Sequence, residues 1–221
     1  MSDAEAAAAS AAPKKKSDLL PRVITSVVAV PPLLALIFWG PHWAWAGLIG
    51  FAAAVGFYEF YGMVQKDEPA HVRWGSVLIG VVFFALVYVF VGRGALVRVD
   101  ASDGELLLGA LALAMWAQFW FNLMRGRDIA KVAATVSGGL AGILYVGVTF
   151  VVLALFKRDF GDDGAGWVLM TLAMTWMSDT GAYFTGRALG KHRLAPIVSP
   201  KKSVEGAVGG LASSIAAAFV V

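Results

Sequence analysis

The sequence predicts an all-α fold, a polytopic integral membrane bundle of about seven transmembrane helices. Only 15% of the residues are charged and 59% are hydrophobic, whereas soluble domains carry about 25% charged residues. The apolar residues come in runs of about 18 or more, the length that crosses a bilayer as a helix. The chain has no cysteine, which excludes disulfides, thiolate nucleophiles and cysteine-based metal sites.

The chain divides into a short tail and one membrane-embedded domain. Residues 1–18 are rich in alanine, lack hydrophobic periodicity and include a run of three lysines, which predicts a disordered cytoplasmic tail. Residues 19–221 form the predicted membrane-embedded domain. In chain order, its expected spans are 23–39, 43–64, 74–91, 106–124, 132–156, 167–184 and 204–221.

The basic residues set the expected orientation. Most of the 18 Lys and Arg residues fall in the tail and in the segments after the second, fourth and sixth spans. The positive-inside rule places these segments in the cytoplasm. We therefore expect a multi-pass protein of the inner or plasma membrane with a cytoplasmic N-terminus. The basic residues that give the net charge of +3 lie at the ends of the predicted helices, so this charge does not indicate a nucleic-acid partner.

Four polar side chains fall within the predicted spans, where polar groups are expensive and mark packing or function. Glu59 lies near the cytoplasmic end of its span, where it either snorkels to the interface or takes part in function. Gln118 and Asn122 lie one turn apart, and we expect them to make interhelical hydrogen bonds. Asp179 lies inside the sixth span, and we expect it to be buried.

Two glycine pairs and the outer loops have simple explanations. Gly138 and Gly142, and likewise Gly206 and Gly210, have the spacing that lets helices pack closely; the alternative is room for a ligand or lipid. The acids of the outer loops are expected to be solvated turn residues, with a cation site at the last two as the alternative. They are Asp100, Asp103, Glu105, Asp159, Asp162 and Asp163.

The segment that begins at Asp179 carries the most chemistry. Asp179, Tyr183, Gly186 and Gly190 follow one another at helical spacing and share one face of the predicted helix. That face would hold a carboxylate, a phenol and two residues without a side chain. Glycine leaves the backbone accessible, so we expect this face to be open to a ligand.

A cluster of cations follows on the cytoplasmic side. Two prolines stiffen the expected loop, and Ser203 and Glu205 stand at the start of the last span, whose helix dipole favours anions. Cations beside a helix N-terminus predict a phosphate-binding site; the plainer alternative is a positive-inside anchor. The cluster comprises Arg187, Lys191, His192, Arg193, Lys201 and Lys202.

The run of residues 178–206, SDTGAYFTGRALGKHRLAPIVSPKKSVEG, with Gly209 and Gly210 after it, resembles the phosphatidate cytidylyltransferases, also called CDP-diacylglycerol synthases. The resemblance covers over thirty residues and almost every polar position, so it is far more specific than a short motif. It implies that CTP and phosphatidate, held at a lipid bilayer, give CDP-diacylglycerol and pyrophosphate with Mg²⁺ as cofactor. A homodimer is a further expectation.

The resemblance also implies roles for individual residues. Asp179, Lys191 and Lys202 are the expected catalytic residues, and Asp179 is also the one candidate metal ligand in this sequence. Phosphate contacts are expected from the basic side chains of the loop, and hydrogen bonds to substrate from Tyr183 and Ser199. The expected substrate-binding residues are Tyr183, Arg187, Arg193, Ser199, Lys201, Ser203 and Glu205.

The sequence departs from the family beyond this run. The family's further signature reads approximately SxxKRxxxxKD, then a His-Gly-Gly element, then DRxD, and its acids are the natural metal ligands. None of these elements is present here. We therefore expect the 221-residue chain to be a C-terminally incomplete form, with its main metal ligands beyond Val221.

Three alternatives remain open at this point. The first is a transporter or proton-coupled carrier that uses Asp179 and Glu59 as relay groups. The second is another CTP-using lipid enzyme, such as an archaeol-type cytidylyltransferase or a polyprenol kinase. The third is a non-catalytic membrane subunit.

The shortage of carboxylates predicts that the isolated chain is inactive, because too few of them are present to hold a two-metal site. We expect no CTP-dependent formation of CDP-diacylglycerol by the purified 221-residue chain. A radiolabelled-CTP assay with phosphatidate in mixed micelles measures it. Robust turnover would contradict the expectation.

Overall fold

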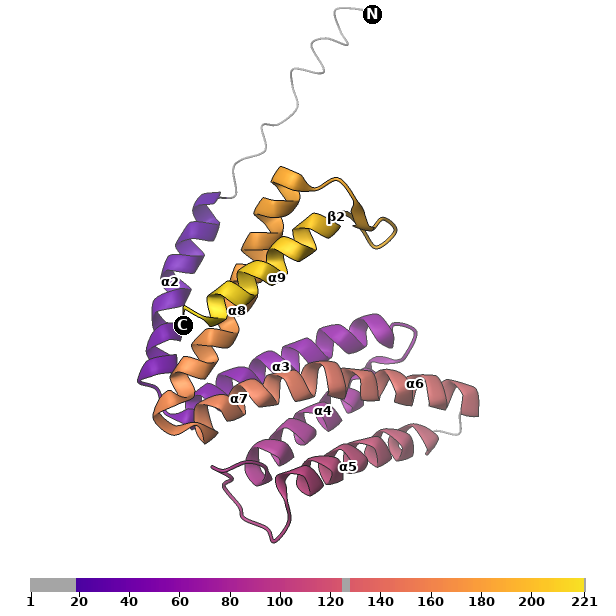
Figure 1. Cartoon of the computed structure of the whole chain (residues 1–221). Helices are drawn as coiled ribbons and strands as arrows, with labels where there is room; N and C mark the ends of the chain where they lie inside the picture. Colours follow the sequence, from indigo (N-terminus) through magenta and orange to yellow (C-terminus); the bar gives the residue numbers. More distant parts are fainter. Residues whose placement is uncertain (1–18, 125–127, 221) are drawn as a thin grey trace, which may run out of the picture.

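The computed structural model describes residues 19–124 and 128–220, with side chains from residue 27 onward. The predicted disordered tail, residues 1–18, lies outside the described residues. The described residues form a set of long helices and one small antiparallel ribbon (Figure 1).

The helices follow one another along the chain, and the connection between α4 and α5 is a long one, residues 91–102. Three segments, α6, η1 and α7, form one continuous rod, in which the π-helical η1 supplies a wider turn. In chain order the elements are α2 (Leu19–Phe38), α3 (His42–Val64), α4 (Ala70–Phe90), α5 (Asp103–Leu123), α6 (Ile129–Gly142), η1 (Ile143–Val148), α7 (Thr149–Asp159), η2 (Gly161–Asp163), α8 (Gly164–Leu189), β1 (Arg193–Ala195), β2 (Ser199–Ser203) and α9 (Val204–Ala218).

The architecture is that of an all-α membrane protein, but the expected count of about seven spans is not confirmed. Among the described residues, four helical stretches are long and apolar enough to cross a bilayer: α3, α4, α5 and the α6–α7 rod. Helix α8 has 26 residues, and its threonines, Ser178 and Asp179 make it too polar to join them. Helix α9 has only 15 residues, and the apolar described part of α2 is similarly short.

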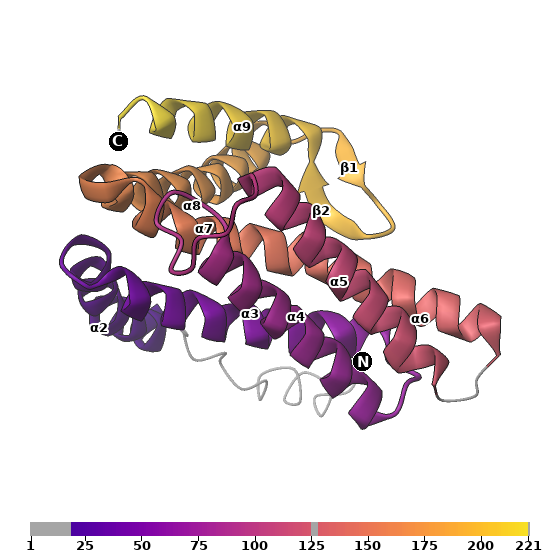
Figure 2. The same cartoon turned by 90° about the horizontal axis from the view of Figure 1, so that it is seen from below.

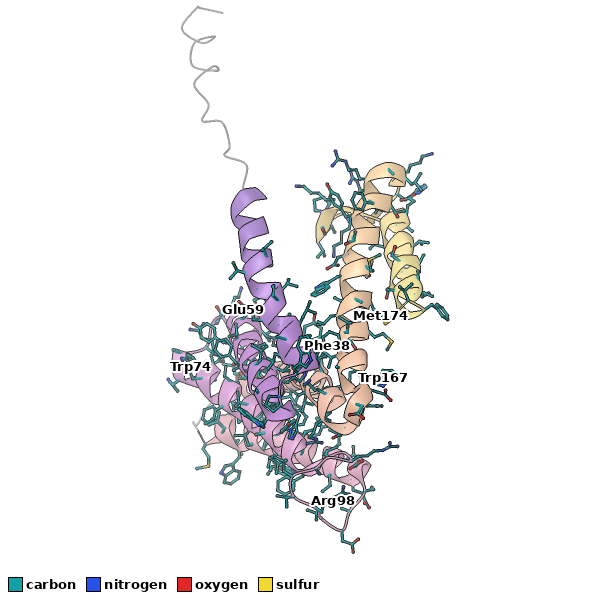
Figure 3. The ribbon with its side chains drawn as sticks, turned by 90° about the vertical axis from the view of Figure 1, so that its left-hand side faces the viewer. Phe38, Glu59, Trp74, Arg98, Trp167 and Met174 are labelled. Carbon is teal, nitrogen blue, oxygen red and sulfur yellow. The ribbon has the colours of Figure 1, made fainter. Side chains whose placement is uncertain are left out.

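The helices form two groups. Helices α3, α4, α5 and the α6–α7 rod lie side by side. Helices α8 and α9 form a close hairpin that leans away from this group and meets it mainly at the α7–α8 corner (Figures 1 and 2). Helix α2 also extends from the same end of the group (Figure 3). The end of α8 and the ribbon therefore project from the bundle core.

Aromatic side chains fill the core of the first group. Trp45, Phe57, Tyr61 and Phe83 are almost fully buried, and the Phe57 and Tyr61 rings stack with centroids 5.8 Å apart. Gly80 on α4 makes room for Phe57, because a Cβ at this position would lie 2.7 Å from the Phe57 ring. Large rings packed against small residues are a general way to bring membrane helices close.

The Gly138 and Gly142 pair serves helix packing, as predicted. A Cβ at Gly138 would lie 2.6 Å from a methyl group of Val64, and a Cβ at Gly142 would lie 2.5 Å from the Tyr61 ring. Tyr61 also donates a buried hydrogen bond of 2.8 Å to the carbonyl oxygen of Gly139. The glycine face of α6 is therefore filled by α3 and leaves no space for a ligand.

A buried polar network joins helices α3 to α6. Gln118 accepts a hydrogen bond of 3.2 Å from Ser76 on α4, which confirms the expected interhelical role. Ser76 in turn accepts from the amide of Gln65, at 3.1 Å. Asn122 instead donates to the Gln118 carbonyl oxygen within its own helix, at 2.7 Å. Such bonds fix the register of helices that pack without a hydrophobic driving force.

The end of the bundle where α4 and α7 finish is held by a buried ion pair. The prediction of solvated turns is wrong for Asp159, which binds Arg158 at 2.6 Å with both side chains nearly buried. The guanidinium of Arg158 lies 4.7 Å from the centre of the Tyr88 ring and donates to the carbonyl oxygens of Tyr88 and Val91. This arrangement fastens the end of α7 to the loop after α4.

Tyr61→Phe should lower the free energy of unfolding by about 1 kcal/mol, because it deletes a buried hydrogen bond while Gly139 keeps its helical partner. Unfolding in mixed micelles with increasing dodecyl sulfate measures the change. Tyr58→Phe is the matched control, since Tyr58 is exposed on the same helix and keeps its ring contact with Trp74. Equal effects of the two substitutions would contradict the assignment.

Candidate functional site

Small residues bring α8 and α9 into backbone contact. A Cβ at Gly206 would lie 2.9 Å from the carbonyl oxygen of Ala182, and one at Gly210 would lie 2.8 Å from that of Ser178. Real Cβ atoms do not approach this closely, so any larger residue would push the helices apart. The packing interpretation of the Gly206 and Gly210 pair is confirmed.

The same contacts contradict the expectation that Gly186 and Gly190 open the backbone to a ligand. A Cβ at Gly186 would lie 3.1 Å from the hydroxyl of Ser203, so this residue belongs to the α8–α9 contact. Gly190 follows the last residue of α8, and its N–H donates to the Gly186 carbonyl oxygen at 3.1 Å. A side chain at Gly190 would collide with that oxygen. Both glycines therefore serve the hairpin itself.

Three polar residues form a line along the exposed side of α8, which we call the α8 stripe: Asp179, Tyr183 and Arg187. They are four residues apart and all exposed, and the Arg187 guanidinium donates to the Tyr183 hydroxyl at 2.9 Å. The expectation that Asp179 is buried is wrong within this chain, since its helix packs on α9 through another face. Among the described residues, no hydrogen bond or ion pair reaches its carboxylate.

The expected proline-stiffened loop is an antiparallel ribbon of β1 and β2. Arg193 pairs with Ser203 and Ala195 with Ser199. Between these two pairs β2 has two more residues than β1, so β2 forms a bulge. A bulge tolerates Pro200, which has no N–H to give to the ladder. The ribbon carries three predicted phosphate contacts, Arg193, Lys201 and Lys202, all exposed.

Glu205 fastens the base of the ribbon to α9. Its carboxylate accepts hydrogen bonds from the backbone N–H groups of Lys191 at 3.1 Å and of His192 at 3.3 Å, and it meets His192 Nδ1 at 2.6 Å. The N–H of Val204 adds a bond of 3.0 Å to the His192 carbonyl oxygen. We call the contact between Glu205 and the 191–192 backbone the Glu205 latch.

The Glu205 latch is charged at neutral pH. Glu205 stands in the first turn of α9, which is not among the four candidate spans. Hydrogen bonds from its own backbone N–H and from the His192 ring lower the pKa of its carboxyl group to about 2. Ser203 caps the same helix end by accepting from the Gly206 N–H at 3.2 Å. Both residues are thus engaged within the chain, and their substrate roles stay predictions.

The cations beside the latch are left without acidic partners. Between described side chains, the ion pairs are Arg158–Asp159 and His192–Glu205. Ser199 is half-buried at the start of β2, and the neighbouring basic side chains point into solvent. The structure therefore gathers most predicted substrate contacts at one end of the hairpin. The exposed cations at this end of the hairpin are Arg187, Lys191, Arg193, Lys201 and Lys202.

Asp179 is set apart from this cluster. Eight residues of helix separate it from Arg187, a rise of roughly 12 Å, so the three predicted catalytic residues Asp179, Lys191 and Lys202 make no mutual contact in the described structure. No group of three or more His, Asp or Glu side chains suited to a metal lies within the described residues. One free carboxylate does not meet the several oxygen ligands that Mg²⁺ needs, so the expected Mg²⁺ site does not fit these residues.

The sequence interpretation missed the ribbon and the latch. Two signals for them were present: glycine at position 190 ends α8, and a serine with an acid two residues later is typical of a helix start. The resemblance to the family assigned this acid, Glu205, to substrate binding. Its real neighbours are backbone N–H groups that spacing alone does not bring together.

Glu205→Ala should loosen the base of the ribbon, because the Lys191 and His192 N–H groups lose their acceptor. We expect faster deuterium uptake across residues 190–204, measured by hydrogen exchange with mass spectrometry. Asp163→Ala, in the exposed turn at the opposite end of α8, is the control and should leave that uptake unchanged. Uptake that is equal in Glu205→Ala and the unmodified chain would rule out the latch.

Comparison with known proteins identifies the family. Residues 20–221 match the model of the cytidylyltransferase family. The phosphatidate cytidylyltransferase of Haemophilus influenzae is 29% identical over 210 residues, covering 90% of this chain and 71% of that protein. That of Thermotoga maritima is 31% identical, covering 92% and 68%. That of Staphylococcus saprophyticus is 42% identical over a shorter stretch of 82 residues, or 37% of this chain and 30% of that protein.

The matches run through α2 to α9 and include the α8–α9 hairpin with its ribbon and cations. The residues that gave the first resemblance thus lie within a match that spans nearly the whole chain. The chain belongs to the cytidylyltransferase family.

Proposed function

We propose that this protein transfers the cytidylyl group of CTP to phosphatidate, giving CDP-diacylglycerol and pyrophosphate. Its family and its relatives named phosphatidate cytidylyltransferase support this reaction class. The observation that carries the proposal is the cluster of exposed, acid-free cations fixed at the end of the α8–α9 hairpin. Both substrates of this reaction present phosphate groups, and such a cluster suits them.

The reaction needs charge neutralisation more than covalent help from the protein. A phosphate oxygen of phosphatidate attacks the α-phosphorus of CTP, a new P–O–P linkage forms, and the bond to the β-phosphate breaks with its electrons leaving on pyrophosphate. Two anions must approach each other, and negative charge grows on the leaving group. Positioning and fixed positive charge are the main sources of rate in phosphoryl-transfer reactions.

The ribbon cations would supply that charge. Arg193, Lys201 and Lys202 are held on a ribbon whose base the Glu205 latch fixes. A cation that is already fixed in place loses less conformational entropy on binding than one on a mobile loop. We assign the CTP phosphates and the phosphatidate headgroup to these side chains and to Lys191 at the base of the ribbon.

The α8 stripe would contact the same substrates along α8, farther from the ribbon. Arg187 and Tyr183 already share a hydrogen bond and are proposed to hold a phosphate oxygen together. Asp179 has no partner among the described residues, so it is the candidate to orient a substrate hydroxyl or a bound cation. Mg²⁺ remains a proposed cofactor, and no step here depends on it.

The alternatives are less well supported. The comparisons give no support to a transporter. Its two relay candidates, Glu59 on α3 (Figure 3) and Asp179 on α8, are both exposed and lie on different helices. Other CTP-using lipid enzymes differ in lipid, which this site does not specify. A cytoplasmic N-terminus, an inner or plasma membrane location and a homodimer are part of the proposal on the grounds of charge distribution and resemblance.

A chimera with a relative tests the function. Residues 19–221 of this chain would replace the matching segment of the Haemophilus influenzae relative, of which the match covers 71%. We expect CTP-dependent CDP-diacylglycerol formation by the chimera. A chimera that inserts and folds like the relative but makes no product at saturating substrate would contradict the proposal.

In the same chimera, Lys201→Gln with Lys202→Gln should reduce kcat/KM by tenfold or more, since a hydrogen bond to a charged group contributes about 1.5–3 kcal/mol and about 1.4 kcal/mol is tenfold. Lys66→Gln is the matched control, because Lys66 is an exposed lysine in the loop between α3 and α4. Equal losses in both variants would remove the ribbon lysines from the site.

A further inference from the structure

The tip of the β1–β2 ribbon is apolar and unusually exposed. Ile197 and Val198 join the two strands, and they are 99% and 87% exposed. Leu194 on β1 is half-exposed beside them. Ile197 and Val198 are therefore hardly covered by any described residue, and clustered exposed apolar groups mark interaction sites.

Cations stand directly behind this tip. From Arg187 to Val204 the sequence contains basic residues and no acid. The next acid is Glu205, whose carboxylate is engaged in the latch with Lys191 and His192. The ribbon therefore presents an apolar end with a positively charged collar, which we define as Arg193, Lys201 and Lys202, all exposed.

The projection of the tip is fixed by the fold. The two strands pair from Arg193 to Ser203, and the latch ties the strand base to the first turn of α9. Figures 1 and 2 show the ribbon standing out from the end of the α8–α9 hairpin. An apolar group held away from the rest of the chain in this way is displayed to an external surface.

We infer that the ribbon tip inserts into the headgroup layer of a membrane that contains anionic lipids, while the collar contacts lipid phosphates. An apolar tip framed by Lys and Arg is the pattern of segments that bind the membrane interface, where the cations add attraction to anionic lipid. Four other helical stretches of the same chain, α3, α4, α5 and the α6–α7 rod, are long and apolar enough to cross a bilayer, so a bilayer is the surface at hand. The collar cations are those assigned above to substrate phosphates, and the inference adds a contact of the apolar tip with the lipid surface that needs neither CTP nor turnover.

The absence of cysteine allows a direct test. Ile197→Cys would carry an NBD fluorophore in the 221-residue chain, reconstituted in vesicles of phosphatidylcholine alone or mixed with phosphatidylglycerol. We expect blue-shifted emission that nitroxide-labelled lipids quench, and more strongly when phosphatidylglycerol is present. Asp163→Cys, in an exposed turn at the other end of α8, is the control and should give the water-like emission of a solvated label.

The collar is tested in the same labelled chain. Lys201→Gln with Lys202→Gln should remove most of the additional quenching caused by phosphatidylglycerol, and so should about 1 M salt, which shortens the Debye length to about 3 Å. Val198→Cys serves as a second reporter in case one labelled position disturbs the ribbon. Water-like emission at both tip positions in anionic vesicles would overturn the inference. So would a blue shift without nitroxide quenching, because that result would assign the tip to a protein surface.

Discussion

The structure depends most on the backbone contact between α8 and α9. Gly206 and Gly210 let α9 approach within contact distance of the Ala182 and Ser178 carbonyl oxygens. This contact turns α8 so that its small residues face α9, and the α8 stripe must then face outward. It also brings the first turn of α9 beside the end of α8, where the Glu205 latch forms. One packing choice thus sets both the exposed carboxylate and the position of the ribbon.

Hydrophobicity predicted the helices well where a helix is apolar throughout. The expected span 43–64 is α3 (His42–Val64), and 106–124 nearly coincides with α5 (Asp103–Leu123). It failed for features that depend on partners distant in sequence. Asp159 was expected to be a solvated turn residue, yet it pairs with Arg158, whose guanidinium lies against the ring of Tyr88 far back in the sequence. The ribbon, likewise, follows from two strands that carry no alternating apolar pattern and that only the α8–α9 hairpin brings together.

The candidate site was predictable in composition and not in geometry. The cations and the stripe residues were all named from the sequence, because their chemistry is unusual in an apolar chain. Which of them serve the fold was not visible, since Glu205 and Gly186 differ from substrate-binding residues only in what they touch. Glu205 binds backbone N–H groups, and Gly186 faces Ser203 and Gly206. The carboxylate stays ionised, and the backbone N–H groups that donate to it offset part of its negative charge beside the neighbouring lysines.

The α8 stripe explains why α8 differs from the four apolar spans. A free carboxylate in hydrocarbon is costly, and within the described chain Asp179 has neither an ion pair nor a hydrogen bond to offset that cost. Its surroundings must therefore be polar, whether from substrate, from a cation or from other protein. Tyr183 and Arg187 continue the same line toward the ribbon. The exposed side of α8 thus forms a polar path from the level of Asp179 to the cation cluster, and a lipid phosphate could follow this path with its acyl chains still in the bilayer.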